Sequence, residues 1–166
     1  MDAEFINPVV AAVKNVLAMM ARIQLDAGSP ERKGREETVS GKNITGLMSM
    51  TGKKEIMPSV GKRIAASMAI TFTEPAIIHI ARNMMPVPPT SVDGVVIDLT
   101  GEIANMVLGS SKQELESAGY VFQLSLPTII VGSDYLIAHK VKAPIIKVPF
   151  KMAEGNFQIE VGYEEI

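Results

Sequence analysis

The sequence predicts an α+β fold in which a mostly antiparallel sheet packs against an N-terminal helix and a central helix. Two groups of segments alternate apolar and polar residues, as strands with one buried face do. They stand before and after a helical middle section, without the strict alternation of strand and helix that a parallel sheet requires. A length of 166 residues and an apolar content of 47% suit one domain, which we expect to span residues 1–166.

The first helix is expected over residues 7–25. An apolar stripe at helical spacing runs from Val9 to Met20. Asn7 can cap this helix, and Pro8 can occupy its first position, where a missing N–H does no harm. The sequence "AGSP" at 27–30 then ends the helix.

The sheet is predicted from period-two alternation. In the clearest segment, Ile64, Met68 and Phe72 share one face, whereas Arg63 and Thr71 lie on the other. A loop is expected between the second and third strands, since glycines and a proline lie there. The expected strands are 35–41, 43–52, 62–73, 120–132, 143–152 and 156–165, and the expected loop is 52–61.

Two helical segments fill the middle of the chain. Residues 74–85 are expected to form a short helix. The segment 92–118 is expected to form two helices, because Gly109 can end the first one. Ser111 and Glu114 have the S-x-x-E spacing of a capping box, which would begin the second.

Composition excludes several functions. A net charge of −2 and 5% aromatic residues leave neither a basic patch nor stacking platforms for nucleic acid. The absence of cysteine excludes disulfides and thiolate metal sites. The N-terminal segment opens with acidic residues, and Lys14, Asn15 and Arg22 interrupt it. We therefore expect neither a signal peptide nor a membrane span, and a cytoplasmic location.

One face of the helix expected before residue 109 is unusually small and polar. Gly101 in a helix interior costs roughly 1 kcal/mol relative to Ala, and Asn105 about half of that. A solvated face gains nothing from these residues, whereas a face that another protein approaches closely gains clearance. Gly101 is therefore expected on a docking face. At 100° per residue, the stripe comprises Asp98, Gly101, Glu102, Asn105, Gly109, Lys112 and Glu116.

Glu102 and Asn105 are expected side by side on this stripe. The carboxylate is an acceptor, and the amide both donates and accepts hydrogen bonds. Such a pair is poorly suited to acid–base catalysis, because Asn does not titrate. It can hold a water molecule while the acid binds a cation, which is what phosphoryl transfer requires. From spacing alone this signal is weak, because E-x-x-N arises by chance in many helices, and a plain solvated face stays open.

The stretch "IDLTGEIANMVLG" at 97–109 resembles the signature helix of the CheC/CheX/FliY family of chemotaxis phosphatases, with its D-x-x-x-E-x-x-N pattern. The stretches "FINPVVAAVKNVL" at 5–17 and "GNFQIEVGY" at 155–163 extend the resemblance, as does the order of elements. Members of the CheC type carry two such motifs. This chain shows one, which is similar to the CheX-type branch.

The resemblance implies a CheC-like fold and a phosphatase that acts on a phosphorylated CheY-type receiver. Its catalytic residues would be Asn105, which orients the attacking water at the aspartyl phosphate, and Glu102, which pairs with a receiver lysine. Asp98 and Gly101 would support docking. No cofactor is expected in this chain, and Mg²⁺ would belong to the receiver. The resemblance also implies a homodimer formed through the sheets.

Three alternatives stay open. The same fold can serve as a non-catalytic docking or scaffold module of a chemotaxis or flagellar-switch assembly. A metal hydrolase would use His79 or His139 with Asp93, Asp98 or Glu102. His79, however, lies in a mostly apolar helix, where a structural histidine is more common, and His139 has no ligand spacing around it. A small-ligand sensor could line its pocket with some of the 11 methionines, but methionine more commonly fills cores.

Overall fold

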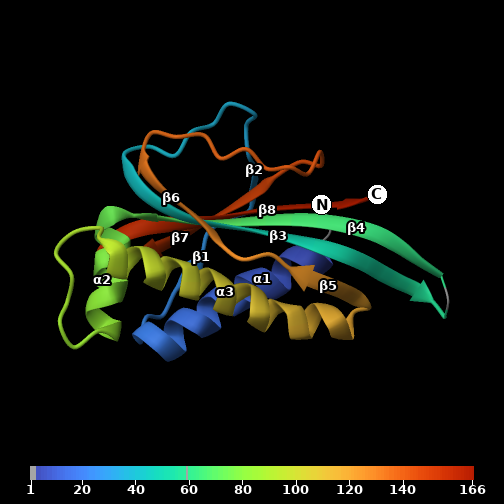
Figure 1. Ribbon diagram of the computed structural model, residues 1–166, viewed down its shortest axis with the longest axis horizontal. Helices are drawn as coiled ribbons and strands as arrows, with labels where there is room; N and C mark the ends of the chain where they lie inside the picture. The colour runs from blue at the N-terminus through green and yellow to red at the C-terminus, as the bar shows by residue number, and fades with distance from the viewer. Residues whose placement is uncertain (1–2, 59) are drawn as a thin grey trace.

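The computed structural model describes residues 3–58 and 60–166 and confirms the α+β fold (Figure 1). All of its strand pairs are antiparallel. In the described residues, the helices are α1 (Ala3–Ala21), α2 (Glu74–Met84) and α3 (Gly94–Ser117). The strands are β1 (Asp26–Ala27), β2 (Glu31–Arg32), β3 (Lys42–Met57), β4 (Val60–Thr73), β5 (Tyr120–Leu124), β6 (Thr128–Ser133), β7 (Ile146–Met152) and β8 (Gly155–Glu165).

The sheet has the strand order β1-β7-β8-β4-β3-β5, with β2 also paired to β7 and β6 also paired to β3. The long strand β3 therefore has two successive partners on one side. Residues 42–47 pair with β6, and residues 50–54 pair with β5. The short connection between β5 and β6 is consequently held at both ends by the same strand.

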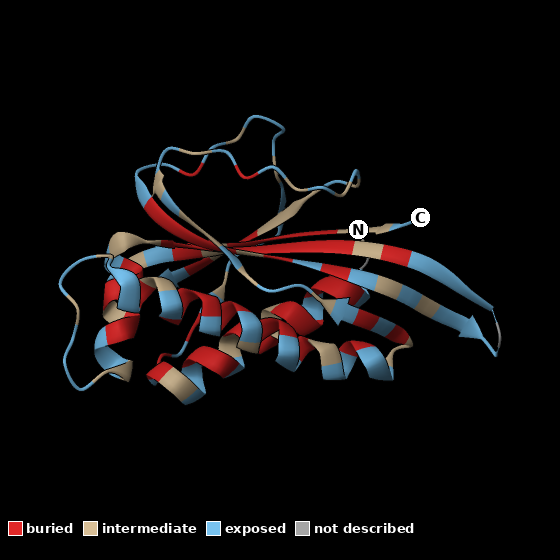
Figure 2. Cartoon of the chain, viewed as in Figure 1, coloured by how far each residue is buried: buried red, intermediate tan, exposed pale blue. Residues whose placement is uncertain are grey.

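The sheet separates two layers (Figure 1). Helices α1 and α3 lie against one face, with α2 at one end of the sheet, whereas the loops around 28–41 and 134–145 lie over the opposite face. Buried residues are concentrated on the strands and on the sides of the helices that face the sheet (Figure 2). A smaller apolar cluster of Val39, Ala69 and Ile137 lies under the loops.

Helix α1 is a core helix. By length and composition alone it could span a membrane, since its mean hydropathy is 1.3. Nine of its 19 residues are nevertheless buried in this fold. Phe5 stacks on Tyr163 with ring centroids 4.9 Å apart and meets Tyr120 edge-on at 5.7 Å. The apolar side of α1 is therefore accounted for by packing within the protein.

The predicted bounds of the first helix are wrong at both ends. The helix already includes Ala3, so Asn7 is not its cap, and Pro8 is a buried residue within the helix. Its end comes at Ala21, because Arg22 adopts a left-handed φ of 55°. The N–H of Ile23 then donates to the carbonyl of Leu17 at 3.2 Å.

The predictions around the first strands also need correction. Residues 35–41 form no strand and belong to the loop above the sheet. The loop expected at 52–61 is mostly strand, because the β3–β4 pairing continues as far as Met57 and Val60. Ser59, within that expected loop, lies outside the described residues. The antiparallel ladder, with a register shift between Glu55 and Met57, thus extends the hairpin past the glycines that suggested a loop.

The segment 92–118 forms one helix of 24 residues, so the predicted break is wrong. Asp93 is its N-cap, with Oδ1 accepting from the N–H groups of Val95 and Val96 at 3.1 Å each. Gly109 lies within the helix. Ser111 is buried, and its hydroxyl donates to the Leu108 carbonyl at 3.0 Å instead of capping a new helix. The strand expected at 120–132 is divided into β5 and β6.

Candidate functional site

Helix α3 is seated closely on the sheet at Gly46 of β3. A Cβ at this position would lie 3.0 Å from the Ala104 Cβ and 3.5 Å from the Thr100 carbonyl oxygen. Thr100 is buried, and its hydroxyl donates to the Val96 carbonyl at 2.8 Å, so the face against the sheet leaves no polar side chain unsatisfied here. The backbone of α3 is therefore fixed relative to the sheet, and so is the position from which its outward-facing side chains project.

The outward face of α3 carries Asp98, Glu102 and Asn105, all of which are exposed. The residues between them, such as Leu99 and Ile103, are buried. Within the described residues, none of the three polar side chains makes a hydrogen bond or an ion pair with another side chain. The structure therefore brings the predicted carboxylate and amide together, one turn apart, with their polar groups available to a partner.

Gly101 does not lie on this exposed face, contrary to the sequence-based expectation. It is buried, and a Cβ here would be 3.5 Å from both Pro127 and Ile129 of the segment that follows β5. The room that glycine leaves is therefore occupied by the protein's own chain. The neighbouring Leu126 is 86% exposed, a prominent apolar residue close to the site that the sequence pattern had not marked.

The two histidines of the metal-hydrolase alternative are engaged elsewhere. His79 on α2 faces Glu154 at 3.2 Å. His139 lies on the loop side of the sheet, with Nδ1 2.7 Å from the Ser67 hydroxyl and Nε2 3.1 Å from Glu160. Among the described residues, no group of three or more His, Asp or Glu could hold a metal ion. The structure thus offers no support for that alternative.

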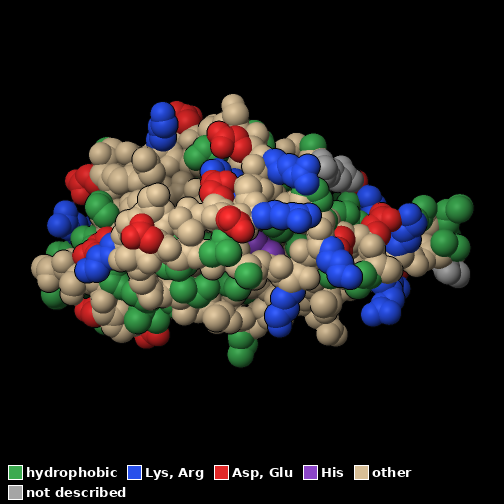
Figure 3. All heavy atoms as spheres, turned by 90° about the horizontal axis from the view of Figure 1, so that it is seen from above, with side chains coloured by type: hydrophobic (Ala, Val, Ile, Leu, Met, Phe, Trp, Pro, Cys, Tyr) green, Lys and Arg blue, Asp and Glu red, His purple; other side chains and the backbone are tan. Residues whose placement is uncertain are grey.

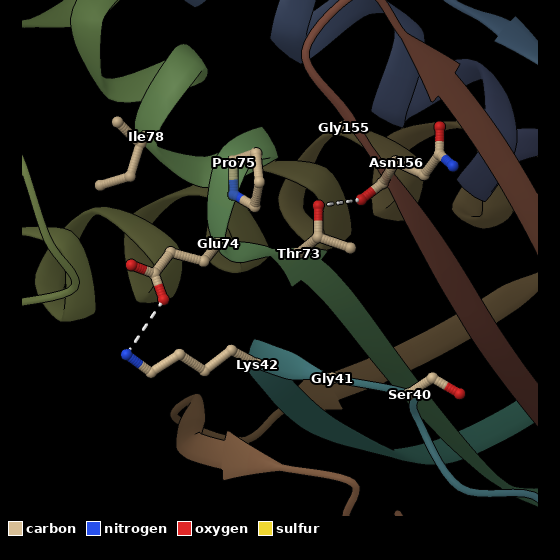
Figure 4. A pocket seen from close by; sticks show the side chains of 9 residues that line it. All are labelled: Ser40, Gly41, Lys42, Thr73, Glu74, Pro75, Ile78, Gly155 and Asn156. Atoms are coloured by element: carbon tan, nitrogen blue, oxygen red, sulfur yellow. Dashed lines mark hydrogen bonds and ion pairs between the residues drawn. The ribbon is translucent and has the colours of Figure 1, made fainter.

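The methionine-lined sensor pocket likewise gains no support. Met48, Met50 and Met68 fill the core between the sheet and the helices, where each is 2% exposed or less. An open hollow of about 650 Å³ lies instead at the start of α2 (Figure 4). There Lys42 pairs with Glu74 at 3.3 Å, and the Thr73 hydroxyl donates to the Asn156 carbonyl at 2.9 Å. None of the predicted site residues lines this hollow.

The candidate site is thus a rigid, exposed helix face. An enclosed cavity suits a small substrate, whereas a projecting face that presents a carboxylate and an amide suits a macromolecular one. Together, fold and site define an α+β protein whose candidate site is an exposed helix face.

Comparison with known proteins assigns the family. The sequence model of the family described as "Chemotaxis phosphatase CheX" matches residues 56–151, more than half of the chain. The crystal structure of the chemotaxis protein CheX from Vibrio vulnificus is 36% identical, with a TM-score of 0.84, and the match covers 98% of this chain and 100% of that one. The chain belongs to the CheX family of chemotaxis phosphatases, which confirms the resemblance found in its sequence.

Two further relatives carry functional names. The CheY-P phosphatase CheX of Thermotoga maritima is 22% identical over 163 residues, which are 97% of this chain and 96% of that protein. The CheX–CheY–BeF3–Mg²⁺ complex from Borrelia burgdorferi is 20% identical, with a TM-score of 0.75 over 97% of this chain and 98% of that one. At this identity, the second comparison shows a shared fold.

Proposed function

We propose that this protein accelerates hydrolysis of the aspartyl phosphate on a CheY-type response-regulator receiver, using Glu102 and Asn105 on α3. The observation that carries the proposal is the exposure of both side chains on one face of a buried, well-anchored helix, without partners in the described residues. Membership of a family of chemotaxis phosphatases and the CheY-P phosphatase name of the Thermotoga maritima relative support it.

Asn105 is the residue we assign to the attacking water. Its carbonyl can accept one hydrogen bond from the water, and its NH₂ can donate to an oxygen of the phosphoryl group. The water oxygen then attacks phosphorus while the bond between phosphorus and the aspartyl oxygen breaks. The products are a free aspartate carboxylate and inorganic phosphate. Since such chemistry depends mainly on positioning, a neutral amide is sufficient for this role.

Glu102 is assigned to docking through charge. Its carboxylate projects from the same face, one turn from Asn105, and would pair with a receiver lysine. Asp98, one turn further towards the helix start, extends the acidic surface and would assist docking. Mg²⁺ would be held by the receiver and would neutralise charge on its phosphoryl group. The CheX–CheY–BeF3–Mg²⁺ complex of the Borrelia burgdorferi protein supports a CheY-type partner.

The test is the decay of a phosphorylated CheY-type receiver from the source organism, measured with and without this protein. Wild type should accelerate the decay, and Asn105→Ala should remove about 10²-fold of that acceleration, the usual effect of deleting one positioned hydrogen-bonding group. Glu102→Ala should mainly raise the receiver concentration needed for half-maximal rate. Gln113→Ala, which removes an exposed amide from the same helix, should leave both quantities unchanged.

Each outcome has a definite meaning. If wild type binds the receivers without accelerating decay in any of them, the chain is a docking or scaffold module and the phosphatase proposal is wrong. If Asn105→Ala retains full activity, the water is positioned by another group.

The homodimer and the cytoplasmic location stay predictions. Among the described strands, β6 pairs on one side with β3, which leaves its outer edge open to a second copy.

A further inference from the structure

A second cavity lies on the face of the sheet opposite α3. Its volume is about 570 Å³, and its walls come from the segments 32–35 and 136–145. Figure 1 shows these segments above the sheet, with α3 below it. This volume falls within the range of about 300–1,000 Å³ that is typical of small-ligand sites. The proposed phosphatase face makes no use of this cavity.

The lining of this cavity is strongly basic. It includes Arg32, Arg35 and Lys142, and none of these side chains has an ion-pair partner within residues 3–58 and 60–166. No Asp or Glu belongs to the described lining, although the whole chain has a net charge of −2. Figure 3 views this side of the molecule and shows several Lys and Arg side chains, interspersed with Asp and Glu, and a His side chain between them.

Four carboxylates around this cavity already have partners within the protein. Glu160 lies beneath the loops and pairs with Lys33 at 2.6 Å. Glu164 accepts the backbone N–H of Lys142 at 3.0 Å. Glu31 and Glu37, on either side of the 32–35 segment, both pair with Lys147. The guanidinium groups at the cavity are therefore left to attract an anion.

The walls of the cavity are held in place by hydrogen bonds within the protein. The Lys33 ammonium group donates to the Ile137 carbonyl at 3.0 Å, and the Lys33 N–H donates to the Ile145 carbonyl at 2.8 Å. His139 anchors the second wall through Ser67 and Glu160. Fixed walls reduce the entropy that a ligand must overcome on binding.

We propose that this cavity binds a nucleotide. The planar guanidinium forks of Arg32 and Arg35 match the geometry of phosphate oxygens. Leu136, Val141 and Ile145 supply apolar lining for the uncharged part of the ligand. This combination of charged and apolar lining distinguishes the site from one that would hold a bare inorganic anion.

Isothermal titration calorimetry of the full chain tests the proposal, with ATP, GTP, AMP and pyrophosphate as probes at low and at physiological salt. At least one nucleotide should bind saturably with one site per chain, more tightly than pyrophosphate. Arg32→Ala and Arg35→Ala should each weaken this binding roughly tenfold, as the loss of a charge-assisted hydrogen bond does. Arg63→Ala removes the same charge from an exposed position on β4 and serves as the matched control.

Three results would overturn the proposal. The first is the absence of saturable binding by every nucleotide at low salt. The second is a loss of affinity in Arg63→Ala as large as that in the two cavity variants, because that would indicate attraction by overall charge. The third is pyrophosphate binding as tight as nucleotide binding, which would reduce the site to one for inorganic anions. Circular dichroism checks that the exposed arginine variants stay folded.

Discussion

The buried ion pair between Lys33 and Glu160 should contribute strongly to stability, and Glu160→Gln tests this. The two side chains are 5% and 0% exposed, with 2.6 Å between the ammonium nitrogen and the carboxylate oxygen. His139 adds a hydrogen bond to the same oxygen at 3.1 Å. Removing one partner of a buried pair costs about 3–5 kcal/mol, because the remaining charge is left without compensation.

The substitution keeps the shape of the side chain, so we expect the free energy of unfolding to fall by about 3 kcal/mol, the lower end of this range. For a chain of this size, each 1 kcal/mol shifts Tm by about 2–4 °C, so Tm should fall by roughly 6–12 °C. Thermal unfolding at pH 7 measures the change. Glu165→Gln is the control, because its pair with Lys62 is on the surface, where solvent screens the charges, and its loss should leave Tm nearly unchanged.

The pH dependence gives a second measure of the same pair. Burial alone would raise the pKa of the Glu160 carboxyl, but hydrogen bonds from His139 and Lys33 outweigh burial and hold the pKa below its ordinary value. The stabilisation is therefore complete above the pKa of the unfolded chain, about 4.3, and is lost as pH falls through the lower folded-state pKa. The stability gap between wild type and Glu160→Gln should shrink over that window.

The reasoning would be refuted if Glu160→Gln were no less stable at pH 7 than Glu165→Gln. It would also fail if the gap between wild type and variant stayed constant down to low pH. Either result would mean that the desolvation of the charges cancels their attraction in this protein.

Two glycines give further predictions. Gly109→Ala should raise the free energy of unfolding by about 1 kcal/mol, because alanine is favoured inside a helix and its Cβ would meet nothing within 4 Å. Thermal unfolding measures this change, and a lower Tm in the variant would indicate that the helix is interrupted at this residue. Gly46→Ala should lower the free energy of unfolding by about 1–3 kcal/mol, because its Cβ would approach that of Ala104 to 3.0 Å. Since the displaced helix carries Asn105, receiver dephosphorylation should slow as well, and an unchanged Tm and rate would show that α3 is seated less closely.

Local patterns predicted the elements whose contacts are periodic in sequence. The alternation from Ile64 to Phe72 identified β4 to within two residues of its observed bounds, Val60–Thr73. The short helix expected at 74–85 is α2, Glu74–Met84. The E-x-x-N spacing placed Glu102 and Asn105 on one exposed face, because helical geometry alone decides that arrangement.

The errors arise where tertiary packing overrides a local signal. Gly109 and Ser111 have the features of a helix boundary, but Leu108 and Leu115 are both fully buried on either side. Their burial is worth more than the roughly 1 kcal/mol that a helical glycine costs, so the helix continues. Gly101 was placed on the outer face because nothing in its own helix reveals that Pro127 folds over it.

The anchoring of α3 has a consequence for recognition speed and selectivity. Glu102 and Asn105 lie near the middle of a 24-residue helix, well away from its fraying ends. In the proposed complex, no loop of this protein has to become ordered before a receiver is engaged, so the conformational entropy that this protein loses on docking is confined to a few side-chain rotamers. Any conformational change that docking requires must then occur in the receiver. Receivers whose groove already fits the helix should therefore bind more readily than receivers whose groove must open first.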